Sequence, residues 1–291
     1  MQGKIIKLVA GVYTVIGEDT KKYECKPRGV FRYQSLSPKV GDNVVFSDQT
    51  INKIEERKND FTRPFVANVD YVLLFISMKK PDFSFELLDR FLINIIEKNT
   101  EPYIIVTKCD LASESEMTDI REKMSYYEKY YKVFYSRKDG MEKEEAFKEL
   151  IKGKIGVVSG QTGSGKSHFL NYLSPSLLLQ TQEISEALGR GKHTTRHTEI
   201  LNVSSYLIAD TPGFSSLEFL SINPSDLKEY FPEFVEVLNQ CRFNQCLHLK
   251  EPGCQVKKLV SEGKILNSRY ENYKKIYGEL VSLKPFYRKE K

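Results

Sequence analysis

Residues 154–173 read KIGVVSGQTGSGKSHFLNYL, and this stretch decides the fold of the largest part of the chain. It starts as a short, apolar, β-branched run of the kind found in buried strands, and KSHFLNYL at its end suits a helix. Between them, Gly160–Ser167 fits the pattern G-x-x-x-x-G-K-[ST]. Because the pattern lies between a strand and a helix, it predicts a phosphate-binding loop, and an incidental glycine-rich turn is the weaker interpretation.

Each residue type in this loop has a task in binding a nucleoside triphosphate. Glycines permit positive φ angles and close backbone approach, so successive N–H groups can surround phosphate oxygens at the start of a helix. Lys166 supplies a cation to the β and γ phosphates, and the Ser167 hydroxyl is a ligand for Mg²⁺. We expect the nucleotide to contact the whole loop and the residue after it: Gly160, Gln161, Thr162, Gly163, Ser164, Gly165, Lys166, Ser167 and His168.

On both sides of the loop the chain alternates between apolar strands and amphipathic helices. Strands are expected at 69–77, 101–107, 131–136, 154–160 and 205–211, and helices at 85–99 and 114–130. Continuous apolar strands separated by helices indicate a parallel sheet covered on both faces, and such sheets bind ligands at the carboxyl ends of their strands. Residues 66–220 are therefore predicted to form an α/β P-loop domain.

Two smaller units flank this domain. Residues 1–65 read as five short strands separated by turn residues, which predicts a small barrel such as an OB-fold or an SH3-like domain. Residues 221–291 read as mostly helical, with a basic, tyrosine-rich helix at 261–283. Basic side chains outnumber acidic ones by 12 to 8 in the first unit and by 13 to 9 in the last, against 19 to 22 between them. Basic ends suit a polyanionic partner, although charge alone leaves an ordinary solvated surface open.

Length and composition exclude several broad classes of protein. The chain has 291 residues, of which 40% are hydrophobic and 29% charged, and this suits two or three globular domains rather than a mainly disordered chain. No stretch reaches the ~18 apolar residues of a membrane span, and the first residues lack the apolar segment of a signal peptide. We expect a cytoplasmic monomer that does not associate with membranes.

The tetrapeptide TKCD at 107–110 indicates which base is bound. It resembles the N-K-x-D element with which GTPases recognise guanine. The Asp110 carboxylate can accept hydrogen bonds from guanine N1–H and the exocyclic amine, a donor pair that adenine lacks, and the stem of Lys108 can cover the base. Ser136 ends the next strand, where a backbone N–H would meet the guanine oxygen. Thr107 stands where the pattern has Asn, which changes a side-chain bond that braces the loop.

A second motif follows the phosphate loop. The tetrapeptide DTPG at 210–213 closes an apolar strand 44 residues after Lys166. Asp210 can hold Mg²⁺ through water, and the Gly213 N–H can sense the γ-phosphate, as in the second switch of GTPases. Ordinary GTPases run from the phosphate loop through the switches to the base reader, whereas here TKCD comes first. A compact sheet with neighbouring chain ends tolerates such a circular permutation.

The first switch is expected at 189–197, GRGKHTTRH, which lies between the phosphate loop and DTPG. A threonine there would close over Mg²⁺ and the γ-phosphate. Thr195 is the first choice and Thr194 the second, so the predicted magnesium ligands are Ser167, Thr195 and Asp210. A solvated basic loop is the alternative for this segment.

The group that positions the attacking water has no clear motif. Phe214 occupies the place where many GTPases have a Gln, and a phenyl ring cannot orient water. Intrinsic hydrolysis should therefore be slow unless a partner or another group does so. His193 is a candidate, although a histidine in a basic loop is as often a phosphate or RNA contact. With Lys166 and Thr195 it completes the predicted catalytic set.

Three cysteines and a histidine cluster in the last unit as Cys241-x4-Cys246-x-His248-x5-Cys254. Three thiolates and one imidazole form a full tetrahedral set for one Zn²⁺ with no position left for water, which indicates a structural zinc site. The total of five cysteines is odd and argues against a disulfide framework. A set of unliganded thiols is the remaining alternative.

The order TKCD, GQTGSGKS, GRGKHTT, DTPGF and then the Cys/His spacing strongly resembles the RsgA family, the ribosome small subunit-dependent GTPases. RGVFR at 28–32 and VGD at 40–42 match as well. The resemblance implies an OB-fold, a circularly permuted GTPase domain and a zinc-binding domain. It also implies a bacterial factor that acts late in small-subunit maturation and contacts ribosomal RNA, with the ribosome stimulating its GTP hydrolysis.

On this interpretation the basic ends would bind RNA. Lys26, Arg28 and Arg32 are candidates for phosphate contacts on the barrel, and the aromatic residues of 268–288 could stack on bases, although a helix more commonly packs its aromatic face inward. A second hypothesis is a nucleotide-gated RNA-binding module with incidental turnover. A third is an ATP-using P-loop enzyme, which equal competition by ATP and GTP, or an Asp110→Asn variant with unchanged nucleotide choice, would support. TKCD in isolation could also be a helix cap with an incidental lysine.

Overall fold

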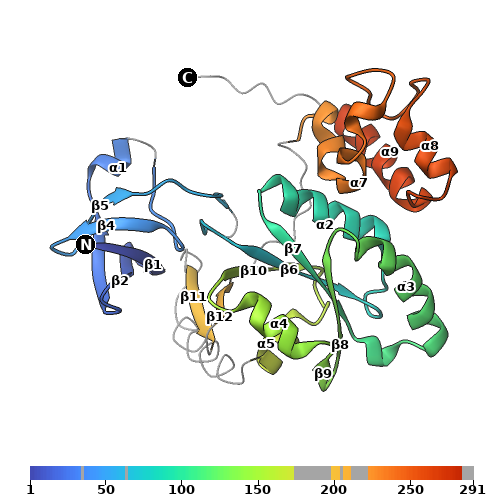
Figure 1. Ribbon diagram of the computed structural model, residues 1–291. Helices are drawn as coiled ribbons and strands as arrows, with labels where there is room; N and C mark the ends of the chain where they lie inside the picture. The colour runs from blue at the N-terminus through green and yellow to red at the C-terminus, as the bar shows by residue number, and fades with distance from the viewer. Residues whose placement is uncertain (34–35, 63–64, 174–197, 204–205, 211–221, 284–291) are drawn as a thin grey trace.

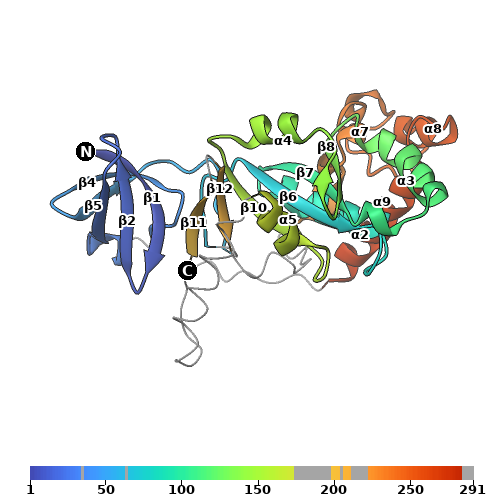
Figure 2. The same ribbon diagram turned by 90° about the horizontal axis from the view of Figure 1, so that it is seen from below.

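The computed structural model describes residues 1–33, 36–62, 65–173, 198–203, 206–210 and 222–283. Three units follow one another: a barrel, a central α/β unit and a helical unit (Figure 1). In the view from below, the barrel and the helical unit lie at opposite ends of the central unit (Figure 2). No helix in the described ranges is long and apolar enough to cross a membrane.

The first unit is a closed barrel of five strands, as predicted. The strands are β1 Gln2–Val9, β2 Val12–Gly17, β3 Lys22–Pro27, β4 Asn43–Ser47 and β5 Thr50–Ile54. β1 pairs with both β2 and β4, and β3 and β5 complete the circle. Ile5, Val15 and Ile51 are fully buried inside it. The run at 22–33, which reads as strand-rich, ends in a short helix, α1 Val30–Tyr33.

Five parallel strands form the central sheet in the order β12-β10-β6-β7-β8. They are β6 Tyr71–Ser77, β7 Glu101–Thr107, β8 Lys132–Arg137, β10 Ile155–Gly160 and β12 Tyr206–Asp210, all close to their predicted ranges. Two antiparallel strands were not predicted: β9 Gly140–Met141 beside β8, and β11 Thr198–Val203 beside β12. Because β11 also pairs with β1, one sheet continues from the barrel into the central unit.

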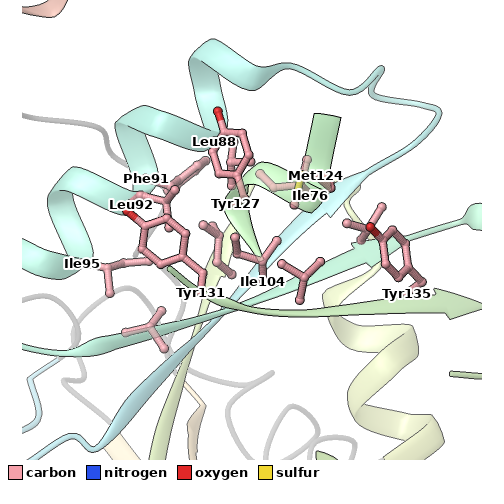
Figure 3. Close-up of a cluster of buried hydrophobic side chains, with 14 of the residues drawn as sticks. Ile76, Leu88, Phe91, Leu92, Ile95, Ile104, Met124, Tyr127, Tyr131 and Tyr135 are labelled. Carbon is pink, nitrogen blue, oxygen red and sulfur yellow. The ribbon is translucent and has the colours of Figure 1, made fainter. Parts of the chain in front are cut away.

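Helices cover both faces of the central sheet. α2 Phe85–Glu97 and α3 Glu114–Tyr127 lie on one face, and α4 Glu144–Ile151 and α5 Lys166–Leu173 lie on the other. Side chains alternate between the two faces along a strand. Ile76 of β6 and Ile104 of β7 therefore share a core with Leu88 of α2 and Met124 of α3 (Figure 3).

Capping residues fix where α2 and α3 begin. The Ser84 hydroxyl accepts a hydrogen bond from the Leu87 amide, and Ser113 forms a capping box with Glu116. These side chains satisfy amides that have no partner within the helix. The caps thereby fix the far ends of the loops that follow β6 and β7, and both loops contribute to the site described below.

The helical unit is less regular than the sequence predicts. Its first segment, 223–240, forms only short turns: η2 Pro224–Tyr230, α7 Pro232–Val235 and η3 Leu238–Gln240. Pro232 has no amide hydrogen to donate, so it starts a new turn instead of continuing η2. The longer helices are α8 Gln255–Ser261 and α9 Asn267–Ser282. Tyr273 and Ile276 of α9 share an apolar core with Ile93 of α2, so this unit packs on the central one.

A buried arginine joins these two units. Arg269 of α9 is only 2% exposed, and it donates hydrogen bonds to Asp89 of α2 and to Glu233 of α7. Its guanidinium lies 4.9 Å from the centroid of the Tyr127 ring and 4.8 Å from that of Phe231. Because buried charges are tolerated only when they are paired and hydrogen-bonded, this cluster fixes how α9 lies against α2.

Candidate nucleotide site and metal centre

The parallel strands bring the predicted motifs to one edge of the central sheet. β7 ends at Thr107, β8 ends at Arg137, directly after Ser136, and β10 ends at Gly160. β12 ends at Asp210 and lies beside β10. Since the carboxyl ends of parallel strands lie at the same edge, the base-reading tetrapeptide lies beside the phosphate loop even though it precedes that loop in the sequence.

The phosphate loop has the backbone shape that its glycines permit. Gly160 has a φ of 126°, and a Cβ there would lie 2.2 Å from the carbonyl oxygen of Phe75, so only glycine fits. The Lys166 ammonium donates to the carbonyl oxygens of Gly160 and Gln161 at 2.8 and 2.6 Å. Partial burial lowers the pKa of Lys166. A bound phosphate would offer this ammonium a full negative charge in place of neutral carbonyl oxygens.

Two side chains of the base-reading tetrapeptide contact the phosphate loop directly. The Thr107 hydroxyl donates to the carbonyl oxygen of Ser164 at 2.6 Å, and the Lys108 ammonium donates to that of Gly163 at 2.7 Å. Lys108 also donates to the carbonyl oxygen of Lys80, in the loop after β6. Thr107, which stands where the pattern has Asn, therefore braces the loop through its hydroxyl group.

A cavity of about 330 Å³ opens beside these contacts. Residues of the base-reading loop, the end of β8 and the start of α5 line it: Thr107, Lys108, Asp110, Leu111, Ser136, Arg137, Lys138, Gly165, His168 and Phe169. A second hollow of about 560 Å³ shares Asp110, Arg137 and Lys138 with it and continues along 139–142. Predicted contacts from three separate motifs thus lie around one space beside the phosphate loop.

The backbone of Lys138 contacts residues on two sides of this cavity, and the sequence patterns did not predict this role. Its amide donates to Asp110 Oδ1 at 3.1 Å, and its carbonyl oxygen lies 3.0 Å from His168 Nε2. One residue therefore connects the predicted guanine reader with the helix that follows the phosphate loop. Its only sequence signal is the tripeptide SRK at 136–138, a partial match to the S-A-K of GTPases. Lys80 belongs to no motif and had no such signal.

Part of the predicted site lies outside the described residues. This part holds His193, Thr194, Thr195 and Gly213. The backbone of Asp210 is placed at the end of β12, whereas its side chain is not described, and Ser167 is exposed at the start of α5. The described geometry brings together the phosphate loop and the predicted base reader, and the roles of these residues and of the switch residues stay predictions.

The Cys/His residues form a compact group of candidate metal ligands. The ligand atoms of Cys241, Cys246, His248 and Cys254 all lie within 4.8 Å of one another. His248 Nδ1 lies 3.6 Å from Cys241 Sγ and 3.4 Å from Cys254 Sγ. A tetrahedral Zn²⁺ with ordinary bond lengths would hold a nitrogen and a sulfur ligand about 3.6 Å apart, so these residues fit the ion.

The surroundings of the cluster suit a structural metal. Burial lowers the pKa of His248 to about 4, which keeps its imidazole neutral and able to ligate. Burial raises the pKa of Cys246 to about 12, so a metal ion would have to displace the thiol proton. The Gln255 amide donates to Cys241 Sγ at 3.3 Å. Four protein ligands leave no open position for a reacting water, so such a site would stabilise the fold of this unit.

Comparisons with known proteins cover the whole chain. Residues 54–220 match the family described as RsgA GTPase, and residues 2–53 match the RsgA N-terminal domain. The chain is 44% identical to the small ribosomal subunit biogenesis GTPase RsgA of Enterococcus faecalis, over 100% of this chain and 99% of that protein. It is also 44% identical to the protein of the same name from Bacillus cereus, over 98% and 99%.

Two solved structures share the architecture. YjeQ from Thermotoga maritima has a TM-score of 0.84 at 35% identity, over 97% of this chain and 99% of that one. YloQ, described as a circularly permuted GTPase, has a TM-score of 0.82 at 35% identity, over 98% and 96%. Both likenesses extend across the barrel, the central unit and the helical unit. The chain is therefore a circularly permuted GTPase that belongs to the RsgA GTPase family.

Proposed function

We propose that this GTPase acts in late maturation of the small ribosomal subunit, where it binds ribosomal RNA and is stimulated by the subunit. The observation that supports the proposal is the cavity that Thr107, Asp110 and Gly165 line together, because it gives the proposed guanine reader and the phosphate loop one shared space. The name of the full-length relatives supports the small subunit as the object of this nucleotide cycle.

In the proposed complex the nucleotide lies along the carboxyl edge of the central sheet. The Asp110 carboxylate accepts hydrogen bonds from N1–H and the amine of guanine, which excludes adenine. Lys166 pairs with the β- and γ-phosphates, and Ser167, Thr195 and Asp210 hold Mg²⁺. When bound, the magnesium ion neutralises charge that develops on the phosphates during hydrolysis.

Hydrolysis by the protein alone is proposed to be slow. Phe214 stands where many GTPases have the Gln that orients water, and a phenyl ring has no hydrogen-bonding group. The Gly213 amide senses the γ-phosphate, and Thr195, with Thr194 as the second choice, closes over it. His193 is our candidate for the group that positions the attacking water.

The surface of the barrel offers basic groups to RNA. Lys26 and Arg28 are exposed at the end of β3 and directly after it, and Arg32 follows in α1, although its side chain is not described. In α9, by contrast, Tyr270 and Tyr273 are buried, with their hydroxyls bonded to backbone carbonyl oxygens. These two rings pack inward, so they are not available to stack on RNA bases.

We further infer that the chain works as a cytoplasmic monomer with one structural Zn²⁺. The Cys3His donor set and its interatomic distances support the ion. Light scattering coupled to gel filtration would test the oligomeric state, and elemental analysis would test for one zinc ion per chain. A dimer, or a chain that folds fully without metal, would contradict this part of the proposal.

Multiple-turnover GTP hydrolysis, with and without purified small subunits, tests the central proposal. We expect slow turnover by the protein alone and a clear rise in kcat when small subunits are added, with large subunits as the matched control. Co-sedimentation with small subunits, in GDP, in a non-hydrolysable GTP analogue and without nucleotide, then shows whether the nucleotide controls binding. A kcat that small and large subunits change equally would contradict the proposal.

A nucleotide-gated RNA-binding module is the alternative that Phe214 favours. Such a protein would bind small subunits in a nucleotide-dependent way while the subunits left kcat unchanged. This result would show that the protein works by nucleotide-controlled binding to the subunit and not by stimulated hydrolysis. Equal competition by ATP and GTP would instead indicate an ATP-using enzyme.

A further inference from the structure

Four consecutive exposed residues lie between two of the candidate zinc ligands. They are Arg242, Phe243, Asn244 and Gln245, and they connect Cys241 to Cys246. We call residues 242–245 the knuckle tip. Phe243 is 45% exposed, more than any other phenylalanine among the described residues. A large apolar ring held in solvent next to a metal-organised loop is a feature that the nucleotide site does not use.

The backbone around the knuckle tip is well anchored. The Arg242 amide donates to the carbonyl oxygen of Gly253 at 3.1 Å, which joins the tip to the loop before Cys254. Gly253 has a φ of 67°, and a Cβ there would lie 3.1 Å from Arg242 Cβ, so the two loops approach closely. Metal binding by Cys241 and Cys246 would fix both ends of the tip as well. The exposed ring is therefore presented on a rigid support.

The charge around the tip favours an anionic partner. Residues 241–258 contain four basic side chains and one carboxylate, that of Glu251. This carboxylate faces the backbone, where it accepts hydrogen bonds from the Leu247 and Leu249 amides at 2.7 and 2.8 Å. A zinc ion with three thiolates and a neutral imidazole carries −1, so the segment keeps an excess of positive charge. The basic side chains are Arg242, Lys250, Lys257 and Lys258.

The guanidinium of Arg242 is close to the exposed ring. It lies 5.7 Å from the centroid of Phe243, within the range of a cation–π contact. An aromatic face, a guanidinium and the side-chain amides of Asn244 and Gln245 make up the set with which proteins hold unstacked bases of single-stranded RNA. A protein partner is less well matched, because stable protein interfaces have an apolar core of several residues, whereas the tip offers a single ring among polar groups.

We propose that the knuckle tip binds an unpaired RNA base, with the base stacked on Phe243 and an adjacent phosphate paired with Arg242. The inference rests on the proposed RNA-binding function and adds to it a contact site in the helical unit. It also predicts that loss of zinc weakens the contribution of this unit to RNA affinity, since the ligands Cys241 and Cys246 hold the tip at both ends.

The test compares zinc-loaded, full-length Phe243→Ala and Phe243→Tyr variants with the unmodified chain. Binding to purified small subunits and to a labelled single-stranded 12-nucleotide RNA is measured across a salt series. Loss of one stacked base should weaken binding of both ligands by Phe243→Ala about 5- to 150-fold, while Phe243→Tyr should keep most of the affinity. Arg242→Gln should lower the salt slope by roughly one ion.

Controls distinguish the loss of an RNA contact at Phe243 from misfolding of the variant. They also distinguish it from failure of the proposed RNA-binding function. Zinc content and GTP affinity should be the same in all variants, and Val235→Ala removes another exposed apolar side chain, 47% exposed, as a matched control. Wild-type affinity of Phe243→Ala for both ligands overturns the inference while leaving the proposed function intact. Failure of the unmodified chain to bind small subunits would instead contradict the proposed function.

Ultraviolet cross-linking identifies what the ring touches. Irradiated complexes of the full chain with small subunits should give a peptide containing Phe243 that carries a nucleotide. A cross-link from this peptide to a ribosomal protein, or a Phe243→Ala variant that loses subunit binding but keeps binding of the RNA, would identify a protein partner and overturn the inference.

Discussion

The hydroxyl of Thr107 donates a 2.6 Å hydrogen bond to the carbonyl oxygen of Ser164, which joins the proposed base-reading loop to the phosphate loop. Both groups are buried, and the Ser164 hydroxyl in turn donates to the carbonyl oxygen of Gln161 at 2.7 Å. The two loops are therefore joined directly, although 57 residues separate the bonded pair.

Removing the Thr107 hydroxyl should weaken binding of every guanine nucleotide. Thr107→Val keeps the shape of the side chain and loses a hydrogen bond worth about 0.5–1.5 kcal/mol, so the Kd for GTP and for GDP should rise roughly 2- to 10-fold. Thr107→Ser keeps the hydroxyl and is the matched control. Titration with fluorescent nucleotide analogues measures both. Equal affinity of the Val variant and the unmodified chain would show that this bond does not order the site.

Asp110→Asn should remove guanine recognition. The variant loses two hydrogen bonds to a charged acceptor, worth about 1.5–3 kcal/mol each, so the affinity for GTP should fall at least ~100-fold. Asp139→Asn is the matched control, because Asp139 lines the neighbouring hollow and not the base cavity. Competition between GTP and ATP measures the effect. An unchanged preference for GTP would show that another group reads the base.

Removal of zinc should unfold the helical unit and spare nucleotide binding. Structural zinc contributes on the order of 10 kcal/mol to small metal-binding folds, and the hydroxyls of Tyr270 and Tyr273 bond the backbone of His248 and Leu247. Cys246→Ser or chelation should therefore reduce the near-ultraviolet circular dichroism of these tyrosines. GTP affinity, measured on the same samples, should change less than about twofold. A spectrum that is unaltered after zinc loss would contradict the structural role.

Arg269→Met should be strongly destabilising. The change leaves the buried carboxylates of Asp89 and Glu233 without their cation, and breaking a buried ion pair costs about 3–5 kcal/mol. Lys274→Gln removes an exposed pair with Glu271 and should cost less than about 1 kcal/mol. Urea unfolding followed by circular dichroism compares the two variants. Similar midpoints would show that apolar packing alone holds α9 on α2.

Local patterns predicted most of the fold, because apolar β-branched strands and a loop between a strand and a helix are properties of short segments. The five parallel strands and the meeting of 107–110 with the phosphate loop follow from such patterns and from the rule that parallel strands share an edge. The pairing of β1 with β11 could not be predicted in this way, since it joins strands from two units. The bond between Arg269 and Asp89 spans 180 residues and has no local signal either.

Irregular backbone is a second reason why parts of the structure could not be predicted from local sequence patterns. Residues 223–240 have the composition of a helix, but Pro232 interrupts it and the apolar side chains pack through short turns. Lys138 contributes to the base cavity through its amide and carbonyl groups, which every residue has. Contacts made by the backbone leave no trace in side-chain chemistry, so the sequence could not assign this position.

The ladder between β1 and β11 restrains rotation of the barrel about the rest of the molecule. Lys7 and Leu8 of the barrel pair with Glu199 and Thr198, and β11 begins directly after the expected first switch at 189–197. Ile155 of β10 also packs in the apolar core of the barrel, so backbone pairing and side-chain packing join the two units at the same edge. A displacement of the barrel relative to the central unit would therefore have to break backbone hydrogen bonds that lie next to the expected first switch.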